Sequence, residues 1–343
     1  MAALSDLRFP PFEPHPLLRH PYAMTALAAL PRRAHGLASE RRIVRVDDST
    51  SVRVEIDRPF AAPRAGLVLV HGLVGSSESP YMIGTASKAV RAGLVVARVN
   101  ARNCGDTESL TSAAYNGGLT AEVEAAAYEL VARDGIEAIH FAGFSIGGNM
   151  VLKLAADWGD APPAWARSVA AVSPCVDFEA SARLLEDGFF RRIVQRRFLR
   201  ELERIVRRRH ALDGGRLPAP DFRGIHSMRR FDDRFTAPMS GYAGVDDYYA
   251  RASVRPRLAS IRLPTLIVAA EDDPLVPFAV FAGVERCSAI RLLSARTGGH
   301  VAFVARRAAR IAGWADLDRF WAENRLVQFA ATLGALEASP GLG

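Results

Sequence analysis

The sequence predicts an α/β protein in which helices flank a mostly parallel sheet and a helical insertion interrupts the chain. Apolar runs typical of strands buried on both faces alternate with helix-like segments over most of the 343 residues. A G-x-S-x-G pentapeptide, residues 143–147, joins one such strand to one such helix. The alternation then stops over residues 176–260, a stretch too long for a simple crossover connection.

The composition is that of an ordinary globular protein, with 49% hydrophobic and 24% charged residues. The formal charge of +7 comes from arginine, because Lys88 and Lys153 are the only lysines. No basic motif with interleaved aromatic residues occurs, so we expect no nucleic-acid partner. The three cysteines form no C-x-x-C pair, which argues against a disulfide framework or a zinc site and favours a reducing, cytoplasmic location. Neither a secretory signal nor an apolar run long enough to span a bilayer is evident.

Residues 1–38 contain six prolines, which is typical of an extended segment that wraps a domain. A short helical piece is expected over residues 23–30, and no catalytic residue is expected in this segment. The first core region, residues 39–175, opens with two strands over residues 41–45 and 51–56, joined by a hairpin turn.

A buried strand is expected at residues 65–70, and it ends in the sequence H-G-x-x-G at residues 71–75. In hydrolases with a nucleophile elbow this position supplies one amide of the oxyanion hole, because the glycines let the backbone approach a substrate carbonyl. The backbone amides of Leu73 and Ile146 are therefore the predicted oxyanion donors. His71 is interpreted as a structural histidine that holds the loop.

A helix over residues 80–91 and a buried strand over residues 94–99 come next. Cys104 lies in the following loop and is interpreted as a small packing residue, since no histidine is near it in sequence. Thr120 is predicted to cap a helix that runs to about Arg133.

Ser145 is the predicted nucleophile. It follows a β-compatible run, residues 137–142, and precedes a helix-like run, residues 149–156, so strand, tight turn and helix occur in the order that exposes a serine hydroxyl. Gly143 and Gly147 suit this turn, because a larger side chain would clash with the neighbouring strand or helix.

After a strand at residues 167–172, the insertion of residues 176–260 carries apolar side chains at helical spacing between Phe190 and Val206, interleaved with arginines. We expect an amphipathic cap helix whose apolar face roofs the active site. The sequence leaves three interpretations of the arginine face open: a solvated surface, a site for an anionic head group, or a peripheral contact with an anionic membrane.

The core resumes in residues 261–335 with a strand at residues 264–270. Asp272 and Asp273 follow this strand and compete for the role of catalytic acid. The spacing favours Asp273, and Asp272 is kept as the alternative acid.

A last strand, residues 289–293, precedes a glycine loop that carries His300. This histidine can accept the Ser145 proton through one ring nitrogen and donate to the acid through the other. An amphipathic helix over residues 314–333 is expected to close the domain.

The chain resembles the YheT-type branch of the α/β-hydrolase superfamily, which includes plant embryogenesis-associated proteins. The resemblance extends over nearly the whole chain, and it implies Ser145 as nucleophile, Asp273 as acid and His300 as base. Asn103 and Met24 depart from the pattern, since the group usually has glycine and glutamine there. The matching stretches are residues 71–81, 100–105, 143–148, 231–242, 247–249, 273–274 and 298–303.

These features predict a serine hydrolase that cleaves carboxylic esters through an acyl-enzyme, without a metal or organic cofactor. The phenylalanine-rich insertion favours an apolar acyl group. The resemblance adds lipid or medium-chain esters, because some members of the group act on phospholipids. Two alternatives stay open: an acyltransferase or thioesterase that uses the same three residues, and a non-catalytic binding protein that keeps the fold.

Overall fold

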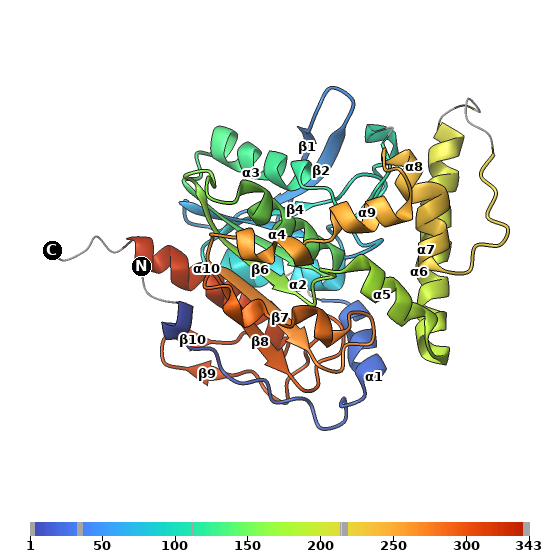
Figure 1. The fold of residues 1–343 in the computed structure, drawn as a ribbon. Coiled ribbons are helices and arrows are strands. Elements are labelled where there is room, and N and C mark those ends of the chain that lie inside the picture. The colour runs from blue at the N-terminus through green and yellow to red at the C-terminus, as the bar shows by residue number, and fades with distance from the viewer. Residues whose placement is uncertain (1–3, 33–36, 112, 213, 215–218, 339–343) are drawn as a thin grey trace.

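A computed structural model describes residues 4–32, 37–111, 113–212, 214 and 219–338. Its centre is an eight-stranded sheet with the order β1-β2-β4-β3-β5-β6-β7-β8 (Figure 1). β1 and β2 form an antiparallel hairpin, β2 is antiparallel to β4, and the remaining pairs are parallel. The predicted mostly parallel sheet is therefore confirmed. Its strands are Glu40–Arg45 (β1), Ser51–Asp57 (β2), Ala65–Val70 (β3), Val95–Val99 (β4), Ala138–Phe144 (β5), Ala166–Val172 (β6), Thr265–Ala270 (β7) and Ile290–Ala295 (β8).

Helices cover both faces of the sheet, as its buried side chains require. The alternating residues of β3 show the division: Val68 and Val70 join the apolar cluster under α3 and α4, while Leu67 and Leu69 join the cluster under α2 and α10. These four helices are Pro80–Arg91 (α2), Ala121–Asp134 (α3), Ile146–Trp158 (α4) and Trp321–Ala338 (α10).

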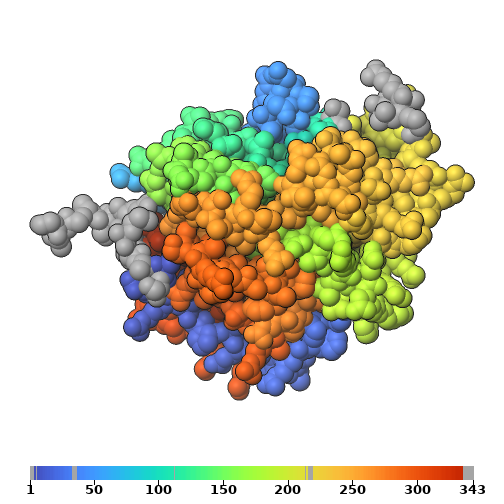
Figure 2. All heavy atoms as spheres, viewed as in Figure 1, coloured from blue at the N-terminus to red at the C-terminus, as the bar shows by residue number. Residues whose placement is uncertain are grey.

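A helical insertion stands between β6 and β7 and forms one side of the molecule (Figures 1 and 2). The predicted long amphipathic helix is α6, which buries Gln195, Leu199 and Leu202. Asn149 on α4 ties the insertion to the core, because its side-chain amide donates to the carbonyls of Gly117 and Ala252 at 2.9 Å each. The insertion comprises Phe178–Glu186 (α5), Phe189–Leu212 (α6), Met228–Phe231 (α7), the π-helical turn Asp232–Thr236 (η4), Ala237–Met239 (α8), Val245–Ala252 (α9) and Arg255–Ser260 (η5).

The N-terminal segment contacts the C-terminal part of the chain. The indole of Trp321 donates to the carbonyl of Pro10 at 2.9 Å, and the amide of His15 donates to the carbonyl of Val304 at 3.0 Å. The expected helical piece is present as α1 (Pro21–Ala26) and the single turn η2 (Leu27–Ala29). Residues 1–3 and 33–36 of this segment lie outside the described residues.

Two local predictions are wrong. The helix expected from residue 314 begins at Trp321, because the Asp318 carboxylate accepts the Phe320 amide at 2.9 Å and so starts the helix later. Before it, Trp314–Ala315 (β10) pairs with Arg310–Ile311 (β9). Thr120 precedes α3 without a side-chain cap, and its carbonyl alone receives the first helical amides.

Candidate active site

Ser145 occupies a strained turn between β5 and α4. Its φ of 53° and ψ of −119° lie outside the regions that L-residues favour. The strain is held by backbone hydrogen bonds, since the amide of Ser145 donates to Val172 O at 2.9 Å and its carbonyl accepts from Cys175 N at 3.1 Å. The turn therefore projects the side chain at the carboxyl edge of the parallel strands.

The glycines flanking Ser145 are required by close backbone contacts. A Cβ on Gly143 would lie 2.2 Å from Gly147 O, and a Cβ on Gly147 would lie 2.4 Å from His71 O. Neither contact can be relieved by a side-chain rotation, because both partners are backbone atoms. The elbow is thus built only with glycine at both positions.

The loop after β3 comes to the same place as the elbow. A Cβ on Gly72 would lie 3.3 Å from Cβ of Ser145, and the Gly72 amide donates to the Tyr81 hydroxyl at 3.0 Å. Leu73 and Ile146 line one cavity together. Among the described residues, neither of their backbone amides donates to another protein group, which leaves both available to a ligand.

His71 stabilises this loop through hydrogen bonds of both ring nitrogens. Its Nδ1 lies 2.7 Å from Gly72 O, and its Nε2 accepts the Ala101 amide at 3.2 Å, so the imidazole is neutral with its proton on Nδ1. Complete burial lowers the pKa of His71 to about 4. These contacts agree with the predicted structural role.

His300 and Asp273 meet across the loops that follow β7 and β8. Nδ1 of His300 lies 2.8 Å from Oδ2 of Asp273. The other carboxylate oxygen accepts the amides of Leu275 and Val276 at 2.8 and 3.0 Å. Three hydrogen bonds therefore fix a buried carboxylate against one nitrogen of the imidazole.

Asp272 points to a different group. One oxygen of its carboxylate accepts the amides of Gly298 and Gly299, both at 2.9 Å. Asp272 thus shapes the glycine loop that carries His300, whereas Asp273 is the carboxylate that contacts the imidazole.

The N-terminal segment supplies a contact that the sequence did not indicate. The hydroxyl of Thr25 on α1 accepts the backbone amide of His300 at 2.9 Å, and it donates to Pro21 O at 2.7 Å. Met24 packs with Ala302 and Val304 in a small apolar cluster. α1, in which no catalytic residue is expected, therefore stabilises the loop that carries His300.

Ser145 and His300 are not joined by a hydrogen bond in the described structure, whereas His300 and Asp273 are. Catalytic hydrogen bonds are often long in the absence of substrate and tighten when it binds. The three side chains follow β5, β7 and β8, whose carboxyl ends share one edge of the sheet. Groups suited to nucleophilic attack, proton transfer and oxyanion binding therefore lie along this edge of the sheet.

A cavity of about 70 Å³ is lined by Leu73 and Ile146, the two residues whose amides are the candidate oxyanion donors. Phe178, Leu185 and Leu202 from the insertion give it a mainly apolar wall, and Asp232 adds a carboxyl group. The further lining residues are Tyr115, Asn116, Cys175, Ser181, Ala182, Met228, Thr236, Tyr248 and Tyr249.

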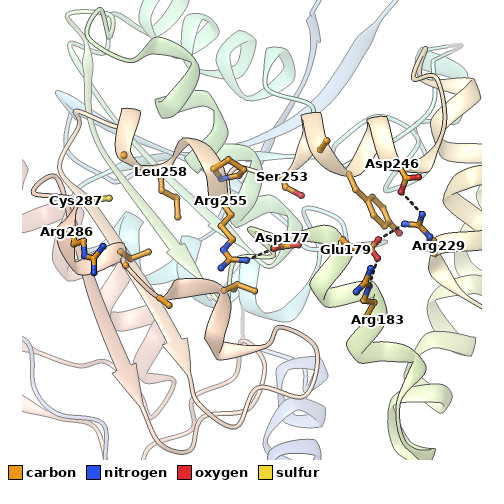
Figure 3. Close-up of a pocket in the computed structure, with 18 residues that line it drawn as sticks. Asp177, Glu179, Arg183, Arg229, Asp246, Ser253, Arg255, Leu258, Arg286 and Cys287 are labelled. Carbon is orange, nitrogen blue, oxygen red and sulfur yellow. Dashed lines mark hydrogen bonds and ion pairs between the residues drawn. The ribbon is translucent and has the colours of Figure 1, made fainter.

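A wider groove of about 770 Å³ lies outside this cavity, between the insertion and the core (Figure 3). Ion pairs within the insertion line it: Arg255 contacts Asp177 at 2.9 Å, and Arg229 contacts both Glu179 and Asp246 at 2.5 Å. Their charges largely cancel, and these ion pairs join elements of the insertion to one another. Tyr249 lines both the groove and the inner cavity.

Cys104 is buried, and burial raises the pKa of its thiol well above the ordinary value. Such a thiol is a poor nucleophile at neutral pH. The predicted packing role agrees with this environment.

The sequence profile of the alpha/beta hydrolase fold family matches residues 67–306. The matched region includes Ser145, Asp273 and His300. The chain belongs to the α/β-hydrolase family. The family membership expected from the sequence is thereby confirmed.

This α/β-hydrolase has relatives among curated proteins. It is 32% identical over 269 residues to YheT of Escherichia coli, named provisionally as an esterase, with 78% of this chain and 76% of YheT covered. Two Saccharomyces cerevisiae proteins follow: medium-chain fatty acid ethyl ester synthase/esterase 2, 26% identical over 73% of this chain, and monoacylglycerol lipase, 27% identical over 71%. The α/β-hydrolase described here spans 59% and 56% of these yeast proteins.

Solved structures share the fold. The α/β-hydrolase superposes on the acylaminoacyl peptidase of Pyrococcus horikoshii with a TM-score of 0.56 at 14% identity, covering 90% of this chain and 43% of the peptidase. It superposes on 2,6-dihydroxy-pseudo-oxynicotine hydrolase with a TM-score of 0.54 at 18% identity, covering 91% and 70%. At these identities the likeness concerns the fold alone. None of the helices in the described ranges is both long and apolar enough to cross a bilayer.

Proposed function

We propose that this α/β-hydrolase is a serine esterase in which Ser145, His300 and Asp273 act as nucleophile, base and acid. The Ser145 hydroxyl attacks the ester carbonyl while Nε2 of His300 takes its proton, and the amides of Leu73 and Ile146 bind the oxyanion. His300 protonates the departing alcohol and then activates the water that releases the acid. Asp273 keeps the imidazole in the tautomer with its proton on Nδ1.

The hydrogen bond of 2.8 Å between His300 and Asp273 is the observation that carries this proposal. Purified protein is expected to hydrolyse short 4-nitrophenyl esters and to be labelled by a fluorophosphonate. Ser145→Ala should lose both properties, while Ser288→Ala, which changes an exposed serine, should keep both. A folded wild-type protein that is not labelled would contradict the proposal.

Acyl transfer to an alcohol is the second candidate, and the name of the yeast ester synthase/esterase favours it. The same acyl-enzyme would then be attacked by an alcohol in place of water. The ratio of ethyl ester to free acid formed in graded ethanol separates the two reactions. A thioester substrate assayed beside its oxygen ester tests the thioesterase alternative.

The cavity supports an apolar acyl group, because Phe178, Leu185 and Leu202 line it. The relatives named as a monoacylglycerol lipase and a medium-chain ester esterase also favour acyl esters of lipid type. A panel of 4-nitrophenyl esters of increasing chain length measures this preference.

We also propose that α6 makes a peripheral contact with anionic membranes. At its start Phe189, Phe190 and Ile193 are 74%, 55% and 47% exposed. Arg196 and Arg200 follow on the exposed side, and within the described part of the chain neither forms an ion pair. An exposed apolar end beside unpaired arginines suits the interface of an anionic bilayer.

Vesicle flotation tests this contact. Binding to vesicles with anionic lipid should exceed binding to neutral vesicles, and Arg196→Gln with Arg200→Gln should weaken it. Arg204→Gln is the matched control, because Arg204 already contacts Glu201 at 2.5 Å. Equal flotation with and without anionic lipid would refute the contact.

A further inference from the structure

The insertion folds around one buried carboxyl group that the proposed hydrolysis does not use. Asp232 accepts the Thr236 hydroxyl at 2.6 Å and the Tyr249 hydroxyl at 2.8 Å. All three residues belong to the stretches, residues 231–242 and 247–249, that carry much of the family resemblance. No ion pair to Asp232 occurs among the described residues, so its charge is balanced by hydroxyl groups alone.

Asp232 lies in the wall of the cavity that also contains Leu73 and Ile146. A group attached to a carbonyl in the oxyanion hole would therefore enter the space beside this carboxyl group. The cavity of about 70 Å³ is larger than one water needs, about 10–15 Å³, and smaller than a benzene site of about 150 Å³. It admits a group of a few heavy atoms.

We propose that Asp232 binds a hydroxyl group carried by the substrate ester, and that the enzyme therefore prefers hydroxylated esters. This inference rests on the esterase function proposed above. A carboxylate offers about four acceptor positions, of which Thr236 and Tyr249 occupy two. Burying a charge is costly unless further hydrogen bonds offset the loss of water, and a neutral hydroxyl supplies one without bringing a second charge.

Matched pairs of esters test the proposal and locate the hydroxyl. Faster hydrolysis of ethyl 3-hydroxybutyrate than of ethyl butyrate would place the hydroxyl on the acyl side of the ester. Faster hydrolysis of glycerol monobutyrate than of propyl butyrate would place it on the alcohol side. In one pair the wild-type kcat/KM should favour the hydroxylated ester by about tenfold to a hundredfold, the range for a hydrogen bond to a charged group. Asp232→Asn should lower that ratio at least tenfold.

Asp233→Asn is the matched control, because Asp233 is the adjacent residue, is exposed and does not line the cavity. It should leave the ratio unchanged. A wild-type ratio near one in both pairs overturns the proposal, as does an Asp232→Asn protein that loses both members of a pair equally. Fluorophosphonate labelling and hydrolysis of ethyl butyrate report separately on the esterase function itself.

The pH dependence of the wild-type ratio provides a second test if Asp232→Asn does not fold. Burial raises the pKa of Asp232 to about 6, so its carboxylate is lost as the pH falls through that value. The neighbouring titratable groups are Tyr248, Tyr249 and Cys175, and burial raises the pKa of each, so all three stay protonated. The ratio should fall between pH 7.5 and 5, and any pH effect that is common to both esters of a pair cancels in it. A ratio that does not change with pH overturns the proposal.

Discussion

The side-chain oxygen of Thr25 lies 2.9 Å from the backbone nitrogen of His300, although 275 positions separate the two residues in sequence. The same hydroxyl donates to Pro21 O at 2.7 Å, so its position on α1 is fixed from both sides. Gly299 sits against this helix, because a Cβ there would lie 2.8 Å from Pro21 O. The N-terminal helix and the loop of the proposed base form one packed unit.

Thr25→Val should impair catalysis without altering the substrate cavity. The variant keeps the shape of the side chain but removes the acceptor for the His300 amide. We expect kcat for 4-nitrophenyl butyrate to fall about tenfold to a hundredfold with KM nearly unchanged, because a displaced base transfers protons poorly. Thr25→Ser should restore most of the rate. Equal rates in the two variants, with equal melting temperatures, would show that packing alone holds the loop.

Asp273→Asn is expected to reduce kcat by about 10⁴, the cost of holding a catalytic histidine in the wrong tautomer. The side-chain oxygen that accepts from Leu275 and Val276 would be kept, so the new amide group would face Nδ1 of His300. The new amide N–H and the N–H at Nδ1 of His300 would then be two donors facing each other, so the imidazole would have to move its proton to Nε2. Single-turnover acylation rates measure this loss directly.

Asp272→Asn tests the competing acid. Its side-chain oxygen can still accept the amides of Gly298 and Gly299, so we expect kcat to fall less than about tenfold. If Asp272→Asn instead costs more than Asp273→Asn, the roles of the two carboxylates are reversed.

Gly147→Ala should destabilise the protein by about 3 kcal/mol, because the new Cβ would lie 2.4 Å from His71 O and 2.5 Å from Val70 O. Gly334→Ala is the same chemical change inside α10, where the nearest atom is 3.6 Å away. It should raise stability by about 0.5–1 kcal/mol, since glycine is a poor helix former. Urea unfolding of both variants gives the comparison, and equal effects would contradict the packing argument.

Leu202→Ala should enlarge the inner cavity and move the preferred acyl chain to a greater length. The expected loss of stability is about 2–5 kcal/mol, as for other buried leucines. Leu258→Ala is the control, because Leu258 is also buried but lines the outer groove. Rates measured with 4-nitrophenyl esters of increasing acyl length show whether the acyl chain lies in the cavity or in the groove. A change of preferred length in Leu258→Ala alone would place the acyl chain in the groove.

The stability of the fold should decrease as the pH falls from about 6.5 to about 4. Burial lowers the pKa of both His71 and His140 to about 4, below the value of about 6.5 in the unfolded chain. The unfolded state therefore binds more protons in this window, and each histidine contributes a slope of up to about 1.4 kcal/mol per pH unit. His140→Gln should remove about half of this slope between pH 6.5 and 5. Denaturant unfolding at several pH values measures it, and an unchanged slope would count against the buried neutral histidine.

Individual elements show which features of the fold the sequence predicts and which it does not. The repeat of apolar runs predicted β3, β4 and β7 because strands buried on both faces carry no polar alternation. The predicted start of α10, residue 314, lies seven residues before the observed start at Trp321. The Asp318 carboxylate accepts the Phe320 amide just before the helix, and apolar periodicity gives no sign of such a hydrogen bond. The prediction of a Thr120 side-chain cap is wrong for a similar reason. Threonine is a suitable capping residue, but the Thr120 side chain makes no capping hydrogen bond.

The elbow and the chain order of its candidate partners can be recognised from the sequence alone. Gly143 and Gly147 are needed because backbone atoms a few residues away or at the end of the adjacent strand lie close to them. Such constraints restrict the residue type at each position, so they can be recognised in the sequence. The spacing favours Asp273 over Asp272, and the structure shows its carboxylate against His300, but that Thr25 accepts the His300 amide and that Asp232 lines the cavity follow from the tertiary structure alone. These relationships depend on how distant elements pack, and packing sets the direction of a side chain in a way that residue type and spacing do not encode.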